Sequence, residues 1–73
     1  MNIPPLQHPR WKELVEGKRQ VSLGFLAVKL MVTRLQGQAK AGAADAAAQE
    51  LYSFFISQHH LPAVQKDLTA IFG

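Results

Sequence analysis

The sequence predicts an all-α fold in one small domain, a bundle of about four helices. Apolar residues recur at spacings of three and four through most of the chain, which is typical of helices that bury one side. Proline and glycine residues stand where such segments begin and end. The best candidate strand, residues 25–32, has apolar residues at both odd and even positions, so it lacks the alternation of a half-buried strand. The predicted helices cover approximately residues 9–16, 22–36, 43–58 and 62–72.

Residues 1–8 are predicted to form an extended arm that precedes a single helical domain, residues 9–73. Pro4 and Pro5 fix the backbone angle φ and lack the amide hydrogen that a helix would use. Ile3 and Leu6 are expected to lie across a groove of the folded body.

The helix at residues 9–16 has a clear start and end. Pro9 suits the first helical position, and Gly17 suits the position just after the last turn. The side chains expected to face inward are Trp11, Leu14 and Val15.

The helix at residues 22–36 is expected to start at Ser22, a suitable N-cap, and to stop at Gly37. The alternative is one long helix that continues through the alanine-rich segment, because alanine has the highest helix propensity. Gly37 and Gly42, five residues apart, argue against that continuous helix.

The helices at residues 43–58 and 62–72 are each amphipathic. In the helix at residues 43–58, Asp45 lies in the first turn, where a carboxylate interacts favourably with the helix dipole. The predicted apolar stripe of this helix is Ala44, Ala47, Ala48, Leu51 and Phe55. Pro62 opens the helix at residues 62–72, and the predicted inward face of that helix is Leu61, Val64, Leu68, Ile71 and Phe72.

The stretch from residue 21 to residue 35 is the most apolar of the chain, and it has apolar residues on two sides. One side is a seam at heptad-like spacing that is expected to pack in the core: Val21, Phe25, Val28, Val32, Leu35 and Ala39. Roughly opposite lie Leu23, Leu26 and Leu30. Either the chain covers both sides itself, or the leucine side contacts a partner or a second subunit, and Gly24 would then mark a close helix crossing.

Size and composition favour association. A chain of 73 residues with no cysteine can form only a small core and no disulfide. Hydrophobic residues make up 48% and charged residues 18%, which leaves little polar surface to spare.

Residues 1–42 hold seven basic and two acidic residues, or +5, and residues 43–73 hold one basic and three acidic residues, or −2. The two parts are therefore electrostatically complementary, within a chain or across a homodimer.

Neither catalysis nor a cofactor is indicated. The acids Glu13, Glu16, Asp45, Glu50 and Asp67 are scattered and are expected to be solvated, and no nucleophile or phosphate-loop motif is present. His59 and His60 are adjacent, so on a helix they point about 100° apart and suit a helix end better than a metal site. No span of about 20 apolar residues is present, so the expected location is the cytoplasm.

The function that the sequence favours is a self-associating protein–protein interaction module, an adaptor, a regulatory subunit or a chaperone-like protein. Its contacts would be made by Leu23, Leu26 and Leu30, to a second copy or to another protein. The alternative is nucleic-acid binding through the cluster Arg10, Lys12, Lys18 and Arg19, with Trp11 among them. Against that alternative, the predicted helix at residues 43–58 has no Lys or Arg, which makes it a poor recognition helix.

Overall fold

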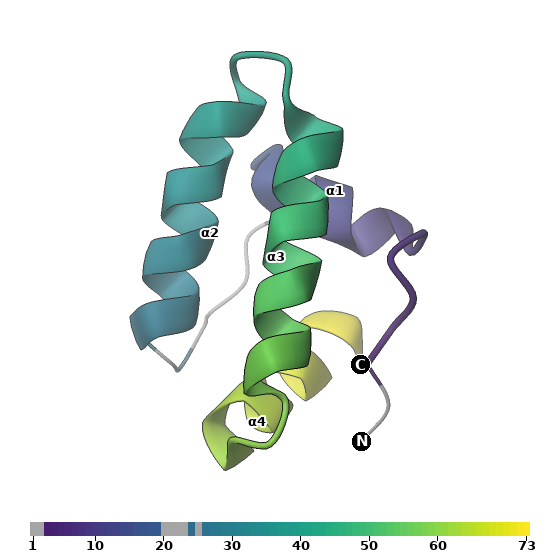
Figure 1. Cartoon of the computed structure of the whole chain (residues 1–73), viewed down its shortest axis with the longest axis vertical. Coiled ribbons are helices and arrows are strands. Elements are labelled where there is room, and N and C mark those ends of the chain that lie inside the picture. The colour runs from purple at the N-terminus through teal and green to yellow at the C-terminus, as the bar shows by residue number, and fades with distance from the viewer. Residues whose placement is uncertain (1–2, 20–23, 25) are drawn as a thin grey trace.

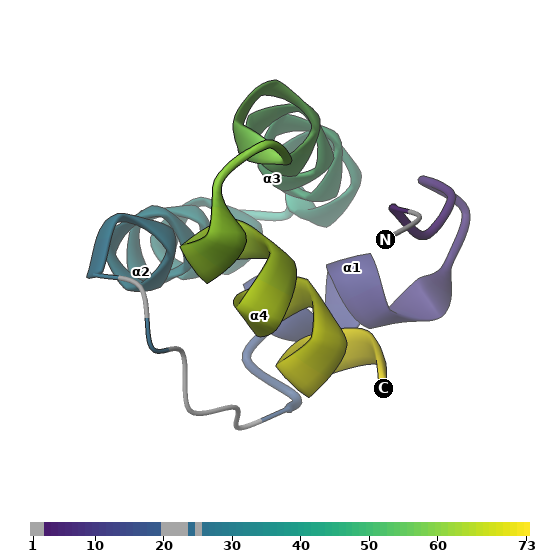
Figure 2. The same ribbon diagram turned by 90° about the horizontal axis from the view of Figure 1, so that it is seen from below.

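The computed structural model describes residues 3–19, 24 and 26–73, and within them the chain forms four helices and no strand. They are α1 (Pro9–Val15), α2 (Leu26–Ala39), α3 (Ala44–Gln58) and α4 (Pro62–Phe72). Helices α2 and α3 form an antiparallel hairpin, and α1 crosses behind it (Figure 1). Seen from below, α4 lies across the end of this three-helix group and closes it (Figure 2). The predicted all-α fold is confirmed.

The helix ends follow from local chemistry. At α1 the His8 ring nitrogen Nδ1 accepts a hydrogen bond of 3.1 Å from the Arg10 amide, which satisfies a free donor of the first turn, and Pro9 occupies that turn. Gly17, after α1, has a φ of +74°, which favours glycine. Pro62 starts α4 at the predicted position. The predicted N-cap of α2, Ser22, lies outside the described residues.

The end of α2 differs from the prediction. The helix continues through Gly37 to Ala39, and the turn to α3 is made by residues 40–43. Gly42 has a φ of +88°, and its amide donates to the Ala39 carbonyl at 3.0 Å. Gly42 rather than Gly37 therefore provides the left-handed residue that the turn requires.

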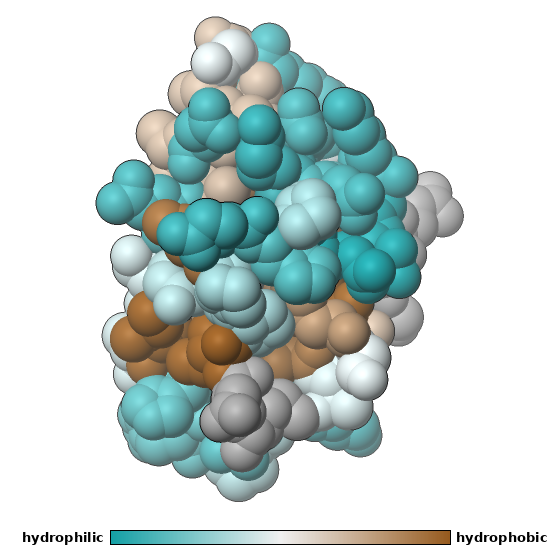
Figure 3. Space-filling model, turned by 90° about the vertical axis from the view of Figure 1, so that its right-hand side faces the viewer, coloured by the Kyte–Doolittle hydropathy of each residue, from teal (hydrophilic) through white to brown (hydrophobic). Residues whose placement is uncertain are grey.

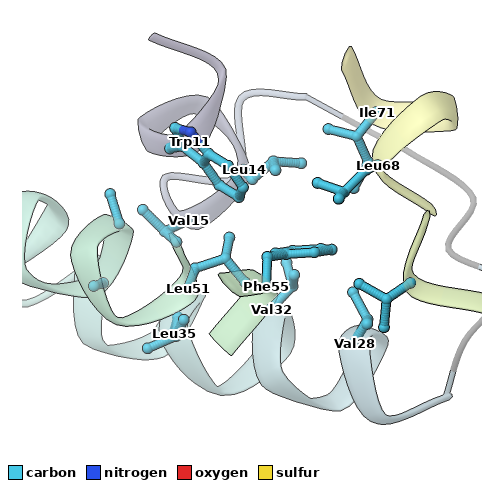
Figure 4. Close-up of a cluster of buried hydrophobic side chains, with 13 residues drawn as sticks. Trp11, Leu14, Val15, Val28, Val32, Leu35, Leu51, Phe55, Leu68 and Ile71 are labelled. Carbon is cyan, nitrogen blue, oxygen red and sulfur yellow. The ribbon is translucent and has the colours of Figure 1, made fainter. Parts of the chain in front are cut away.

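The core is built from one stripe on each helix, as Figure 4 shows. The predicted inward residues of α1 are buried, as are Val28, Val32 and Leu35 of the α2 seam, whereas Ala39 of the seam is partly buried. Most of the stripe on α3 and of the inward face of α4 is also buried. Trp11 lies at the centre, with ring centroids 5.4 Å from Phe55 and 4.6 Å from Phe72. Val21 and Phe25 of the seam lie outside the described residues. The buried apolar residues are Trp11, Leu14, Val15, Val28, Val32, Leu35, Ala47, Ala48, Leu51, Phe55, Val64, Leu68 and Ile71.

Residues 3–8 lead into α1 without regular secondary structure. Ile3 packs against the core, as predicted, and Leu6 is half-buried in a turn that the His8 amide closes by donating to the Pro5 carbonyl at 2.9 Å. The Pro5 carbonyl also accepts a 3.0 Å hydrogen bond from the indole nitrogen of Trp11. The indole donor holds the arm against the aromatic centre.

Candidate interaction surface

Leu26 and Leu30 are the most exposed large apolar side chains of the described residues, at 67% and 61%. Each is two positions from Val28, which is fully buried, so each lies about 160° around α2 from the core-facing line. The other three helices, α1, α3 and α4, pack on the Val28 side of α2 and leave the opposite side exposed. We refer to the outward side formed by Leu26 and Leu30 as the α2 face.

Two hydrogen bonds identify the flanks of the α2 face. The Gln36 side-chain amide donates to the Leu14 carbonyl at 3.0 Å, so this flank faces α1. The Arg34 guanidinium forms an ion pair and hydrogen bond with Glu50, so the other flank faces α3. The Arg34 side chain also contacts the Met31 sulfur.

Phe54 of α3 lies beside the α2 face. It follows Glu50 by one turn, on the same side of α3, and Leu30 precedes Arg34 by one turn on α2. Since α2 and α3 are antiparallel, both steps lead toward the same end of the hairpin (Figure 1). Phe54 is half-buried and packs against the core. By this register, Phe54 lies at the level of Leu30 on the neighbouring helix, one turn from the Arg34–Glu50 pair and further from the interhelical turn.

Of the two remaining predicted interface residues, Leu23 lies outside the described residues and Gly24 precedes α2. The Gly24 amide donates a 3.0 Å hydrogen bond to Oδ1 of Asp67 on α4. A Cβ atom at Gly24 would lie 3.7 Å from the same oxygen, which is ordinary contact. Gly24 is therefore held to α4 by its backbone, and the space around it does not require glycine.

Asp67 was predicted to be solvated, and this prediction is wrong. Its exposed fraction is 3%, and it is the single buried charged residue of the part of the chain that the structure describes. Its position explains the burial, because Val64, Leu68 and Ile71 surround it on the inward side of α4. Helical spacing thus contained the signal: an acid on an apolar stripe needs a polar partner.

Three of the four residues of the predicted basic cluster form ion pairs within the chain, and those of Lys12 and Lys18 lie at the surface. Lys12 lies 3.2 Å from Asp45 of α3, and Lys18 lies 3.7 Å from Glu16. Arg10 lies 3.4 Å from Glu13 and also donates to the Ile71 carbonyl of α4. Arg19 is exposed.

The two adjacent histidines lie at the end of α3, as predicted. His59 caps the helix, and its Nδ1–H donates to the Ile56 carbonyl at 2.6 Å. The centroids of the His59 and His60 rings are 6.3 Å apart, and the two ring planes are perpendicular. Among the residues that the structure describes, no three His, Cys, Asp or Glu side chains are grouped so that they could hold a metal ion.

Ile56, the third exposed large apolar residue, belongs to a different side of the molecule. It follows Tyr52 by one turn, and the Tyr52 ring contacts Trp11 of α1, with centroids 5.4 Å apart. The face opposite α2 carries its most strongly apolar atoms in its lower half, whereas its upper half is mostly hydrophilic with mildly apolar atoms at the top and along one edge (Figure 3). The α2 face and this second apolar area are separated by α3.

Within the described residues, the fold and surface together define a small helical protein whose α2 face is apolar and exposed. In the described part of the chain, no helix has both the length and the apolar character needed to cross a membrane. No protein-family model, curated protein or solved structure matches the chain.

Proposed function

We propose that the protein is a protein–protein interaction module that binds a helix of its partner on the α2 face. The observation that carries this proposal is the exposure of Leu26 and Leu30 on successive turns, opposite a buried line. Covering two leucines contributes on the order of 3 kcal/mol. Apolar residues at a spacing of four are typical of helix-in-groove recognition.

Two kinds of partner agree with this surface. A second copy would form a two-fold homodimer in which the α2 face meets itself, and such association would support a core as small as this one. A helix of another protein would make the protein an adaptor, a regulatory subunit or a chaperone-like protein. The cytoplasmic location stays a prediction from the sequence.

Nucleic-acid binding through Arg10, Lys12, Lys18 and Arg19 has less support. Three of these four cations lie beside carboxylates, which reduces the positive potential available to phosphates. Leu26 and Leu30 of the α2 face, by contrast, are not covered by the other described residues.

Leu26→Asp tests the proposal. A carboxylate at the centre of a helix–helix contact must be desolvated, so we expect association or partner capture to fall by at least tenfold. Light scattering would measure the molecular mass of the assembly, and affinity capture would measure the amount of partner protein that is bound. Gln38→Asp is the matched control, because Gln38 is an exposed polar residue of the same helix that lies three turns from Leu26 and about 120° around from it.

Far-UV circular dichroism must first show that Leu26→Asp is as helical as the wild type. If the folded variant then keeps both the mass and the partner binding of the wild type, the α2 face is not the interaction surface.

A further inference from the structure

Residues 59–61 separate α3 from α4, and this short connection is already partly helical. His59 has helical backbone angles, with a φ of −61° and a ψ of −21°. The Leu61 amide donates to the Gln58 carbonyl at 3.0 Å, whereas Leu61 itself is extended, with a φ of −81° and a ψ of 129°. The change of direction between the two helices therefore depends on the backbone of His60 and Leu61.

Pro62 favours the extended conformation of Leu61. A proline ring clashes with a helical conformation of the residue before it, and proline has no amide hydrogen with which to continue a helix. The Gln65 side-chain amide also donates to the His59 carbonyl at 3.0 Å, which satisfies an acceptor at the end of α3. A continuous helix from α3 into α4 is thus opposed at Pro62.

In a continuous helix, the apolar side of α4 would leave its own core. Phe55 of α3 and Val64 of α4 are nine residues apart, so in one helix they would lie about 180° apart at about 100° per residue. With Phe55 kept in the core, Val64, Leu68 and Ile71 would point away from it. These three side chains are now at most 2% exposed, so the open chain would need another surface to cover them.

The surface that fits this side of α4 is the one that α4 now covers, across the end of the other three helices (Figure 2). Two specific contacts hold α4 there. The Asp67 carboxylate accepts from the Gly24 amide at 3.0 Å, and the Phe72 ring packs against Trp11 with centroids 4.6 Å apart. Gly24 and Trp11 both lie outside α3, the helix to which α4 is joined. A second copy of the chain therefore offers α4 the same partners.

We propose that residues 59–61 are the hinge of a helix exchange. In the exchanged dimer, α4 of each copy docks on the core of the other copy and makes there the contacts that it makes in the closed chain. Because these contacts are the same in both states, the hinge decides between them. Pro62 favours the closed chain by opposing the continuous helix that separates α4 from its own core.

Pro62→Ala tests the hinge. Alanine removes the clash with residue 61 and favours a helix, so the association constant of the dimer should rise at least tenfold. All chains carry Leu26→Asp, which removes any dimer made through the α2 face, and are refolded together from urea at high protein concentration. Light scattering measures the molecular mass. Pro9→Ala is the matched control, because Pro9 opens α1 and no helix of the described residues precedes it.

Disulfide formation between copies identifies the exchange. The chain has no cysteine, and a Cβ atom at Gly24 would lie 3.7 Å from Oδ1 of Asp67, within reach of a disulfide between these two positions. Pro62→Ala chains that carry Gly24→Cys should form a linked heterodimer when refolded with Pro62→Ala chains that carry Asp67→Cys. Lys66→Cys is the control for Asp67→Cys, because Lys66 is exposed and lies about 100° around α4 from Asp67. It should give at least tenfold less heterodimer.

Circular dichroism must show that Pro62→Ala is as helical as the chain that keeps the proline; if it is not, Pro62→Gln takes its place. The exchange is overturned if the folded variant stays monomeric or dimerises no more than Pro9→Ala. It is also overturned if the dimer forms without the disulfide between positions 24 and 67. None of these results bears on the α2 face, because every chain carries Leu26→Asp.

Discussion

Asp67 connects α4 to the segment that leads into α2. Its carboxylate is buried among apolar side chains, and it accepts the Gly24 amide at 3.0 Å. A buried carboxylate is costly unless hydrogen bonds compensate for the lost water. This arrangement orients the backbone just before Leu26, the first leucine of the α2 face, so Asp67 contributes to the shape of that surface from another helix.

Asp67→Ala should lower the free energy of unfolding by about 1–3 kcal/mol, because the part-buried hydrogen bond from the Gly24 amide is lost. Asp45→Ala is the matched control: Asp45 is 88% exposed and pairs with Lys12, so its loss should cost less than about 1 kcal/mol. Urea unfolding followed by circular dichroism measures both variants. Equal losses would mean that the Asp67–Gly24 bond contributes no more than a surface ion pair.

At the scale of the helices, α2 shows how tertiary packing determines where a helix ends. Gly37 is unfavourable inside a helix, which is why the sequence predicts a stop there. Beyond it, however, Ala39 packs against the core, and this contact favours two further residues of helix. The helix ends where Gly42 adopts the left-handed conformation.

Substitution of the two glycines by alanine should have opposite effects. Gly37 lies within the helix, and a Cβ atom there meets nothing within 4 Å, so Gly37→Ala should stabilise the fold by about 0.5–1 kcal/mol. Gly42 also has open space, but its φ of +88° strains any other residue, so Gly42→Ala should destabilise by about 1 kcal/mol. Thermal unfolding of both variants tests this. A loss of stability in Gly37→Ala would contradict the helical assignment at that position.

The four helices and their buried stripes were predictable because helical periodicity is a local property of the sequence. The exposed leucines of the candidate site, Leu26 and Leu30, were predictable for the same reason. The role of Asp67 and the position of Phe54 beside the α2 face were not, since both depend on how separate helices are placed against one another.

At the scale of the whole molecule, contacts between the two ends of the chain close the fold. Arg10 donates to the Ile71 carbonyl, 61 residues away, and the His8 and Phe72 rings meet edge to face with centroids 5.1 Å apart. Phe72 also packs against Trp11. The last turn of α4 therefore completes the aromatic centre around the start of α1, opposite the hairpin that carries the α2 face (Figure 2).

Phe72→Ala should therefore destabilise the whole fold by about 2–4 kcal/mol, although Phe72 is the last residue of α4. The substitution removes a large apolar side chain from its contact with Trp11, which destabilises the fold. Because Phe72 is only half-buried, the loss in free energy of unfolding should be smaller than the largest losses seen for fully buried phenylalanines. Ile56→Ala is the control, because Ile56 is 41% exposed on α3 and should cost about 1 kcal/mol or less. Trp11 is the single tryptophan, so its fluorescence reports the loss directly during urea unfolding. If Phe72→Ala unfolds at the same urea concentration as Ile56→Ala, the two chain ends do not stabilise the core, and α4 acts only through its earlier turns.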